Sequence, residues 1–315
     1  MDEVDLKNED VAYLRYTNNV DDIAYWELGN VCTYKCSYCS PVFHAGDVPY
    51  QDTQLIQDTL NRLPPMQILF SGGEPTFHPD FEKIVNERPA HIKIGMVSNA
   101  SRPYAFWERI IDNMNFAILT YHPEYANFDR FFKVAELVYL KHKKSGRVNL
   151  IMLPAQWDEC VDVYNKLSAA GVPVIAKQVL ASFGKGCSGS IPDYTQEQID
   201  WLSSAAFPPS TGNVRISVFD KNHKVIYLTS ANELLAKNQT NFKGWTCHVP
   251  SQYLLITQGG FVFNTTCEQK KMVGTLKEGF TYPNPPMVCK QNLCWCFTDI
   301  AGKKTAPGFT GEIPK

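Results

Sequence analysis

The feature that most constrains the fold is a regular alternation of short apolar runs and amphipathic helical stretches between residues 24 and 206. The apolar runs predict strands at 24–28, 67–70, 92–97, 116–121, 148–153 and 174–179. Helical periodicity predicts helices at 52–63, 80–86, 104–113, 128–143, 158–170 and 196–206. Strict β/α alternation implies an α/β protein with a parallel sheet, and these units favour an open, partial (β/α)6 barrel of the TIM type. Chemistry in such folds gathers at the carboxyl ends of the strands.

Three cysteines, Cys32, Cys36 and Cys39, follow the first predicted strand with the spacing C-x3-C-x2-C. Thiolates on one such loop can hold three corners of a cubane iron–sulfur cluster and leave the fourth iron without a protein ligand. Part of a zinc site is the alternative, although structural zinc sites need four closing ligands and usually use paired C-x2-C knuckles.

Composition indicates the cellular compartment of a protein with these cysteines. Ten cysteines in 315 residues are too sparse for a disulfide scaffold, and the acidic start of the chain has no signal-peptide pattern. We therefore expect a cytoplasmic protein with no membrane partner, since no apolar run approaches the roughly 20 residues that cross a bilayer. The net charge of −2 gives no general basic field for nucleic-acid backbones.

The second predicted strand ends in Gly72-Gly73-Glu74-Pro75, where paired glycines let the backbone approach a ligand closely. Together with the cysteine motif upstream, this strand end resembles the radical S-adenosylmethionine (radical SAM) superfamily, whose C-x3-C-x-aromatic-C signature is matched by Cys32, Cys36, Tyr38 and Cys39. The resemblance implies that the three cysteines bind a [4Fe–4S] cluster whose open iron chelates SAM. It also implies that Gly72, Gly73, Glu74 and Pro75 bind the methionine ammonium and that Tyr38 lies near the adenine.

The resemblance further implies an activity. A reductant such as flavodoxin or ferredoxin supplies an electron, SAM is cleaved reductively, and a 5′-deoxyadenosyl radical abstracts a hydrogen atom from the substrate.

Polar residues at two further strand ends are candidates for the same pocket. Ser98 and Asn99 end the third strand, where the family often places side chains against the SAM ribose or carboxylate, with turn capping as the alternative. His122 follows the fourth strand and is a candidate for a substrate or proton role, with a structural role as the alternative.

A linker at 207–212 precedes a change of pattern to short β-type runs at 214–219, 225–228, 253–256 and 261–263. We therefore divide the chain into an N-terminal extension (1–23), a core (24–206) and a small C-terminal domain (207–315). Cys187 lies on a glycine-rich loop of the core and is interpreted as a bystander or a reactive thiol.

The C-terminal domain contains five cysteines around a predicted β-hairpin: Cys247, Cys267, Cys289, Cys294 and Cys296. Their order resembles the auxiliary-cluster extension called SPASM, or its shorter form, twitch. The chain departs from that pattern because Gly260 stands seven residues before Cys267, where the family usually has five, and because C-x4-C-x-C is too short for two complete clusters. We expect one auxiliary [4Fe–4S] cluster, bound by Cys247, Cys267, Cys294 and Cys296 or with Cys289 in place of one of the last two. A zinc ribbon is the alternative.

The substrate class stays open among three hypotheses. Relatives with such an extension act mostly on peptides, amino acids and small metabolites, which favours oxidation, bond formation or rearrangement on an amino acid or peptide. The short segment before the first strand weakens the peptide case. The second hypothesis is radical modification or isomerisation of a nucleotide or nucleic-acid base that carries an amino-acid-derived group, with aromatic residues such as Trp245 and Tyr253 stacking on the base. The third is a non-catalytic iron–sulfur or zinc protein, against which the intact Gly72 to Pro75 argues.

Overall fold

The computed structural model describes residues 5–17, 22–179, 193–205, 216–294 and 296–313. The predicted linker at 207–212 and Cys187 lie outside these ranges. The described chain forms two compact units, one of residues 24–212 with 256–260, the other of residues 1–23, 213–255 and 261–315. We call the first the core unit and the second the small unit.

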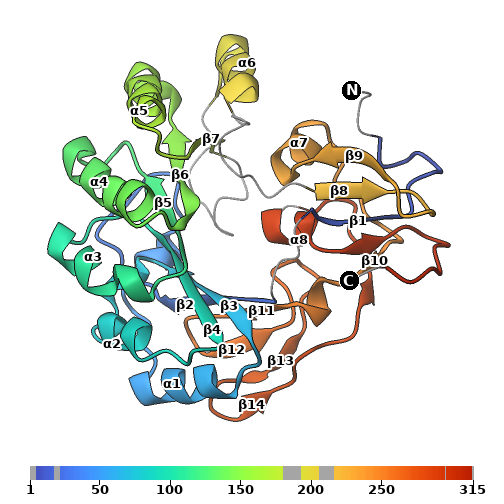
Figure 1. Cartoon of the computed structure of the whole chain (residues 1–315), viewed down its shortest axis with the longest axis horizontal. Coiled ribbons are helices and arrows are strands. Elements are labelled where there is room, and N and C mark those ends of the chain that lie inside the picture. The colour runs from blue at the N-terminus through green and yellow to red at the C-terminus, as the bar shows by residue number, and fades with distance from the viewer. Residues whose placement is uncertain (1–4, 18–21, 180–192, 206–215, 295, 314–315) are drawn as a thin grey trace. The chain divides into compact units, whose positions relative to one another are not determined.

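The core unit is built on a sheet in which the strands follow one another in chain order (Figure 1). Its strands are β2 (Ile23–Gly29), β3 (Met66–Gly72), β4 (Ile92–Ser98), β5 (Phe116–Tyr121), β6 (Ser145–Met152) and β7 (Val174–Gln178). From β3 to β7 every neighbouring pair is parallel. The α/β class and the open, partial-barrel sheet predicted from the alternation are therefore confirmed.

Helices cover the outer face of this sheet (Figure 1). They are α1 (Thr53–Arg62), α2 (Phe81–Asn86), α3 (Tyr104–Ile110), α4 (Phe128–Ala135), α5 (Trp157–Ala169) and α6 (Gln196–Ala205). In α5 the buried residues Cys160, Val163 and Leu167 recur at helical spacing and form one apolar stripe. The Asp52 side chain begins α1 by accepting a hydrogen bond from the Leu55 amide at 3.0 Å.

Two predicted helices are less regular than expected. The helix predicted at 104–113 ends as a 3₁₀ turn, η3 (Ile111–Asn113), and the helix predicted at 128–143 continues beyond α4 as a π-helical turn, η4 (Glu136–Lys141). Shorter 3₁₀ turns are η1 (Pro41–Phe43), η2 (Pro75–Phe77) and η5 (Pro154–Gln156), each with proline at its start.

The small unit contains a six-stranded sheet in the order β15-β10-β16-β1-β8-β9. These strands are β1 (Tyr13–Tyr16), β8 (Ile216–Phe219), β9 (Val225–Thr229), β10 (Thr246–Cys247), β15 (Met287–Val288) and β16 (Lys304–Thr305). It also contains β11 (Tyr253–Ile256), β12 (Phe261–Phe263), β13 (Met272–Thr275), β14 (Gly279–Phe280), α7 (Ala231–Ala236), α8 (Phe297–Ala301) and the 3₁₀ turn η7 (Val249–Ser251). The hairpin that the sequence predicts corresponds to β11 and β12, which are neighbours in their sheet, and β12 also pairs antiparallel with β13.

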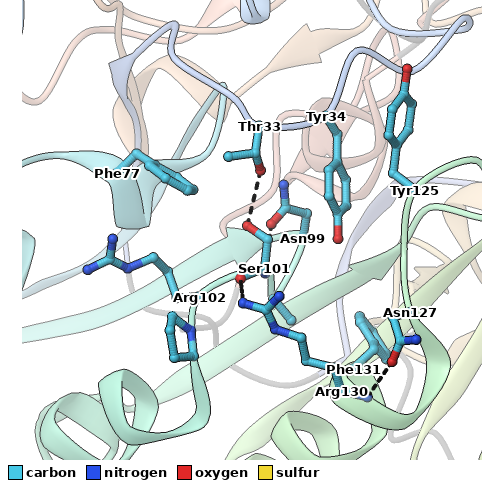
Figure 2. Close-up of a pocket in the computed structure, with 12 residues that line it drawn as sticks. Thr33, Tyr34, Phe77, Asn99, Ser101, Arg102, Tyr125, Asn127, Arg130 and Phe131 are labelled. Carbon is cyan, nitrogen blue, oxygen red and sulfur yellow. Dashed lines mark hydrogen bonds between the residues drawn. The ribbon is translucent and has the colours of Figure 1, made fainter.

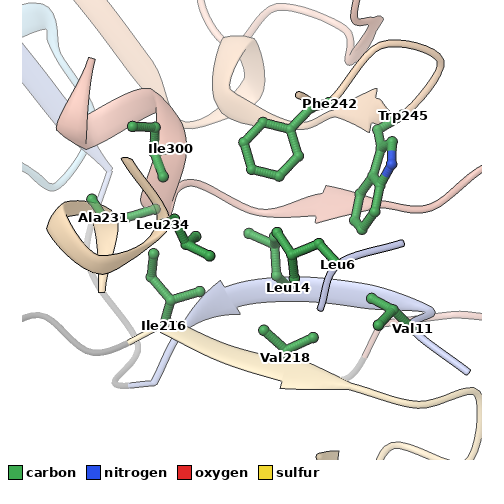
Figure 3. Close-up of a cluster of buried hydrophobic side chains, with 11 residues drawn as sticks. Leu6, Val11, Leu14, Ile216, Val218, Ala231, Leu234, Phe242, Trp245 and Ile300 are labelled. Atoms are coloured by element: carbon green, nitrogen blue, oxygen red, sulfur yellow. The ribbon is translucent and has the colours of Figure 1, made fainter. Parts of the chain in front are cut away.

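The core of the small unit joins both ends of the described chain. Leu6, Val11 and Leu14 pack with Phe242 and Ile300 and with residues of β8 and α7 in one apolar cluster (Figure 3). Strand β1 pairs with β8 on one side and β16 on the other. The structure thus differs from our division of the sequence, because the described residues within 1–23, treated there as an extension, pack and pair within the small unit. Among the described residues, no helix is long and apolar enough to cross a bilayer.

Candidate active site

The cysteine loop, residues 30–40, leaves the carboxyl end of β2 and is tied by backbone hydrogen bonds to the end of β3. The amide of Gly73 donates to the Gly29 carbonyl at 2.9 Å, and the amide of Glu74 donates to the Val31 carbonyl at 2.8 Å. A Cβ atom at Gly72 would lie 2.3 Å from the Gly29 oxygen, and one at Gly73 would lie 2.4 Å from the Val31 oxygen. Glycine is therefore required at both positions because the loop backbone itself passes this closely.

Glu74 is a buried carboxylate that joins the ends of β3 and β4. Its Oε1 atom accepts hydrogen bonds from the hydroxyls of Thr76 at 2.7 Å and Ser98 at 2.8 Å, and from the Thr76 amide at 3.2 Å. Its Oε2 atom accepts from the Asn99 amide at 2.7 Å. Burial raises the pKa of Glu74, and these donors oppose that shift. This geometry gives Glu74 a positioning role, while binding of the methionine ammonium by Gly72 to Pro75 stays a prediction.

Ser98 and Asn99, the predicted polar residues after β4, differ in what they can reach. The Ser98 hydroxyl donates to Glu74 and accepts a hydrogen bond from the Ala100 amide at 3.0 Å. The second of these bonds caps the turn after β4, as the structural alternative for Ser98 predicts. The Asn99 side chain accepts from the Ser101 amide at 2.9 Å, and its Nδ2 donates to the Cys32 sulfur at 3.6 Å. Asn99 therefore connects the strand end to the cysteine loop.

The three cysteines of the loop have the chemistry that an iron–sulfur cluster requires. Burial raises the pKa of Cys32 to about 11 and that of Cys36 to about 12, so as free thiols they are protonated at neutral pH and release protons when they bind metal. The Tyr34 amide donates to the Cys32 sulfur at 3.4 Å, and N–H groups directed at sulfur are a feature that tunes such clusters.

The three thiols lie near one another, because those of Cys32 and Cys36 each interact electrostatically with that of Cys39, and Cys36 also interacts with Cys32. A cubane binds each thiolate to a different iron. The donor set of Cys32, Cys36 and Cys39 therefore fits such a cluster.

A cavity of about 390 Å³ lies beside the cysteine loop (Figure 2). Thr33 and Tyr34 of the loop line it together with Asn99 and Ser101 after β4 and Arg130 of α4. The Thr33 hydroxyl donates to the Ser101 hydroxyl at 3.3 Å, and the Arg130 guanidinium donates to the Ser101 carbonyl. The volume suits a small molecule, and aromatic walls with a few polar groups are typical of such sites.

His122, predicted as a candidate for a substrate or proton role, lies against the cysteine loop. Its Nδ1 atom is 2.7 Å from the Tyr38 hydroxyl and 3.5 Å from the Cys36 sulfur, and its ring stacks on Tyr38 with 6.0 Å between centroids. Burial lowers the pKa of His122 to about 4, so the ring is neutral at physiological pH. Tyr38, predicted near the adenine, is buried with its hydroxyl at His122, and Tyr34 is the loop aromatic that lines the cavity.

The described cysteines of the small unit gather around Cys247 on β10. Burial raises the pKa of Cys247, whose thiol interacts electrostatically with that of Cys289, and the thiols of Cys267 and Cys294 interact with Cys247 in turn. Cys296 interacts with Cys294. All five predicted positions therefore lie in one region of this unit, with Cys289 among the neighbours of Cys247.

A buried carboxylate fixes the loop before Cys267. Asp299 of α8 accepts hydrogen bonds from the hydroxyls of Thr265 at 2.9 Å and Thr266 at 2.8 Å.

An open parallel sheet with three thiols after its first strand and a cavity beside them is the arrangement that the sequence predicts for an α/β enzyme of the iron–sulfur type. Residues 26–181 match the sequence profile of the radical SAM superfamily. These residues therefore form a radical SAM domain.

Curated relatives match a short part of the chain. Mycofactocin maturase MftC from Mycobacterium ulcerans (strain Agy99) is 35% identical over 69 residues, which are 21% of this chain and 19% of the relative. MftC from Mycobacterium tuberculosis (strain H37Rv) is 33% identical over 69 residues, which are 21% of this chain and 18% of the relative. The chain thus spans about a fifth of the length of the curated relatives it matches.

Solved structures share the fold at low identity. The crystal structure of Streptococcus suis SuiB has a TM-score of 0.54 and 12% identity, and the match covers 82% of this chain and 64% of that one. The structure of anSMEcpe with bound AdoMet has a TM-score of 0.50 and 12% identity, and the match covers 82% of this chain and 79% of that one.

Thr33, Tyr34 and Arg130 line the cavity but were not predicted as site residues from the sequence. Thr33 and Tyr34 stand inside the cysteine motif, where the position of the loop signals proximity to any ligand. Arg130 belongs to no sequence motif. The residue that could have located it is Asn127, whose side chain accepts a hydrogen bond from the Arg130 amide at 3.1 Å and so begins α4 beside the cavity.

Proposed function

We propose that this enzyme binds a [4Fe–4S] cluster through Cys32, Cys36 and Cys39 and SAM in the adjoining cavity, and that it abstracts a hydrogen atom from an amino acid or peptide. The observation that carries the proposal is the contact between the two sites: Asn99 lines the cavity and donates to the sulfur of Cys32. When bound, the cluster and SAM supply a hydrogen-abstracting radical.

The side chains around the cavity would bind and orient SAM and exclude water. The guanidinium of Arg130, held by the Ser101 carbonyl, offers a positive charge for the carboxylate of SAM. Tyr34 and Phe131 form aromatic walls that keep water from the reacting atoms. Glu74 would hold Asn99 in place through its backbone amide.

A peptide is the substrate class that the comparisons favour. MftC is a maturase by name, SuiB is solved with its precursor peptide SuiA at a TM-score of 0.52, and anSMEcpe is solved with a peptide at a TM-score of 0.51. We propose oxidation, bond formation or rearrangement on an amino acid side chain within a peptide.

We further propose that the small unit binds one auxiliary [4Fe–4S] cluster. The grouping of Cys267, Cys289 and Cys294 around Cys247 supports a ligand set of these four residues. Among the ligand sets predicted from the sequence, this favours the one in which Cys289 takes the place of Cys296.

Anaerobic reconstitution tests the cofactors. We expect about eight irons per chain, as two cubanes require, and formation of 5′-deoxyadenosine from SAM on addition of a reductant. Bound zinc without SAM cleavage would contradict the proposal.

A substrate panel tests the class. Short synthetic peptides, each with one reactive side chain between glycines, are compared with the free amino acids and with nucleosides for stimulation of 5′-deoxyadenosine formation and for a change of mass. We expect a peptide to be modified; modification of a nucleoside alone would refute the peptide assignment.

A further inference from the structure

The segment directly after β5 holds the middle of the cysteine loop from one side. Within this segment, which we call the latch (residues 122–125), Glu124 reaches the amide and the hydroxyl of Ser37, Tyr125 reaches Lys35, and His122 reaches Tyr38. The loop residues that the latch contacts lie between the first and the third cysteine.

The contacts of the latch are of different kinds and act on neighbouring residues. The Ser37 amide donates to Glu124 Oε2 at 2.8 Å, and the Ser37 hydroxyl donates to Oε1 of the same carboxylate. The Tyr125 hydroxyl donates to the Lys35 carbonyl at 3.0 Å, while its ring stacks on Tyr34 with 5.3 Å between centroids.

The latch has a fixed shape of its own. The amides of Tyr125 and Ala126 donate to the His122 carbonyl at 3.0 and 2.8 Å, which closes the segment into a tight turn after the strand. The latch is thus anchored to β5, a buried strand of the sheet, and not to the loop that it holds.

We propose that the latch is a positioning device that holds the cysteine loop ready for its cluster and slows loss of that cluster. A loop whose backbone is already fixed loses less conformational freedom when three of its side chains become ligands, and it releases the ligands less often. Glu124 is the central member because it alone binds both a backbone and a side-chain donor of the residue that follows Cys36. The effect on the cluster rests on the proposed function, whereas the contact itself does not.

The first experiment uses the metal-free chain, so it does not depend on the cluster. Hydrogen exchange of the Ser37 amide is compared in the wild type, Glu124→Ala and the control Glu82→Ala, which removes an exposed carboxylate that pairs with Arg109 at 2.6 Å. We expect at least fivefold faster exchange of this amide in Glu124→Ala only, because its acceptor is lost. An unchanged exchange rate of the Ser37 amide in Glu124→Ala would refute the proposal that the latch holds the loop.

The second experiment uses the reconstituted enzyme and an iron chelator under anaerobic conditions. Iron that the Cys36→Ala variant fails to bind is assigned to the loop, which separates it from iron elsewhere. We expect iron loss from the loop to be about tenfold faster in Glu124→Ala and intermediate in Glu124→Gln, which keeps one acceptor oxygen. The thermal unfolding midpoint of each variant is measured to show that it is folded.

The outcomes are distinguishable. Equal rates of iron loss in the wild type and Glu124→Ala would overturn the effect on the cluster, and so would an equal acceleration in Glu82→Ala. A wild-type loop that binds no iron would refute the proposed function and this effect, while the exchange of Ser37 would still decide whether the latch holds the loop.

Discussion

Replacing Glu74 by glutamine tests whether one buried carboxylate fixes the ends of two strands. Glutamine keeps the shape of the side chain but has one acceptor oxygen, and its amide group donates. If the oxygen takes the place of Oε1, the bonds from Thr76 and Ser98 are kept and the Asn99 amide loses its acceptor.

The magnitude follows from that lost acceptor. A buried N–H without a partner costs about 1–3 kcal/mol, so we expect Glu74→Gln to lower the free energy of unfolding by about 2 kcal/mol. Glu74→Ala leaves the backbone amides of both Thr76 and Asn99 without their acceptor and should cost about 4 kcal/mol.

Urea unfolding of the metal-free chain, followed by far-ultraviolet circular dichroism, measures both changes, and hydrogen exchange of the Asn99 amide localises them. Glu82→Gln on the exposed face of α2 serves as the control and should stay within about 0.5 kcal/mol of the wild type. The reasoning fails if Glu74→Gln is equally close to the wild type or if exchange of the Asn99 amide is unchanged.

Three further predictions concern the metal sites and one buried charge. Cys36→Ala should abolish 5′-deoxyadenosine formation, measured by chromatography, because two thiolates cannot replace three; retained turnover would refute the role of the loop. Cys289→Ala should remove about half of the iron and Cys296→Ala should not, and equal iron contents in the two variants would refute the proposed ligand set. Burial lowers the pKa of Lys177 from 10.5 to about 7, so the unfolded chain binds more protons between these values and the contribution of Lys177 to stability rises with pH across that range. In urea unfolding, the stability of the wild type should therefore rise relative to that of Lys177→Met between pH 7 and pH 10; a difference that does not change with pH would contradict this.

The core unit could be predicted from the sequence because each of its elements repeats one pattern. The runs at 92–97 and 116–121 are apolar, short and separated by an amphipathic stretch, and they became β4 and β5. The irregular end of the helix predicted at 128–143 could not be predicted, because hydrophobic periodicity does not distinguish a π-helical turn from an α-helical one.

The small unit was harder to predict because its strands are paired across long separations. Strand β1 has two fully buried residues, Tyr13 and Leu14, but nothing in its own sequence shows that its partners are β8 and β16. Strands of two residues, such as β10 and β15, are too short for any periodicity.

The candidate site shows the same limit at the level of side chains. The motifs located the cysteine loop and the glycine-rich strand end, but the contact of the loop with Glu124 joins residues 87 positions apart. Ser98 and Glu74 were predicted from a family pattern to touch the cofactor, and only the structure shows that they hydrogen-bond to each other.

The pairing of Tyr13 with Thr305 has a consequence for the synthesis of the protein. Strand β1 leaves the ribosome long before its partner β16 and must wait for it before the sheet is complete, while consecutive parallel strands of the core unit can pair as they emerge. A fragment of the small unit that begins at β8 would lack β1, the strand that lies between β16 and β8 in its sheet. To fold after expression, this fragment should therefore need a peptide that contains β1 (Tyr13–Tyr16) to be supplied with it.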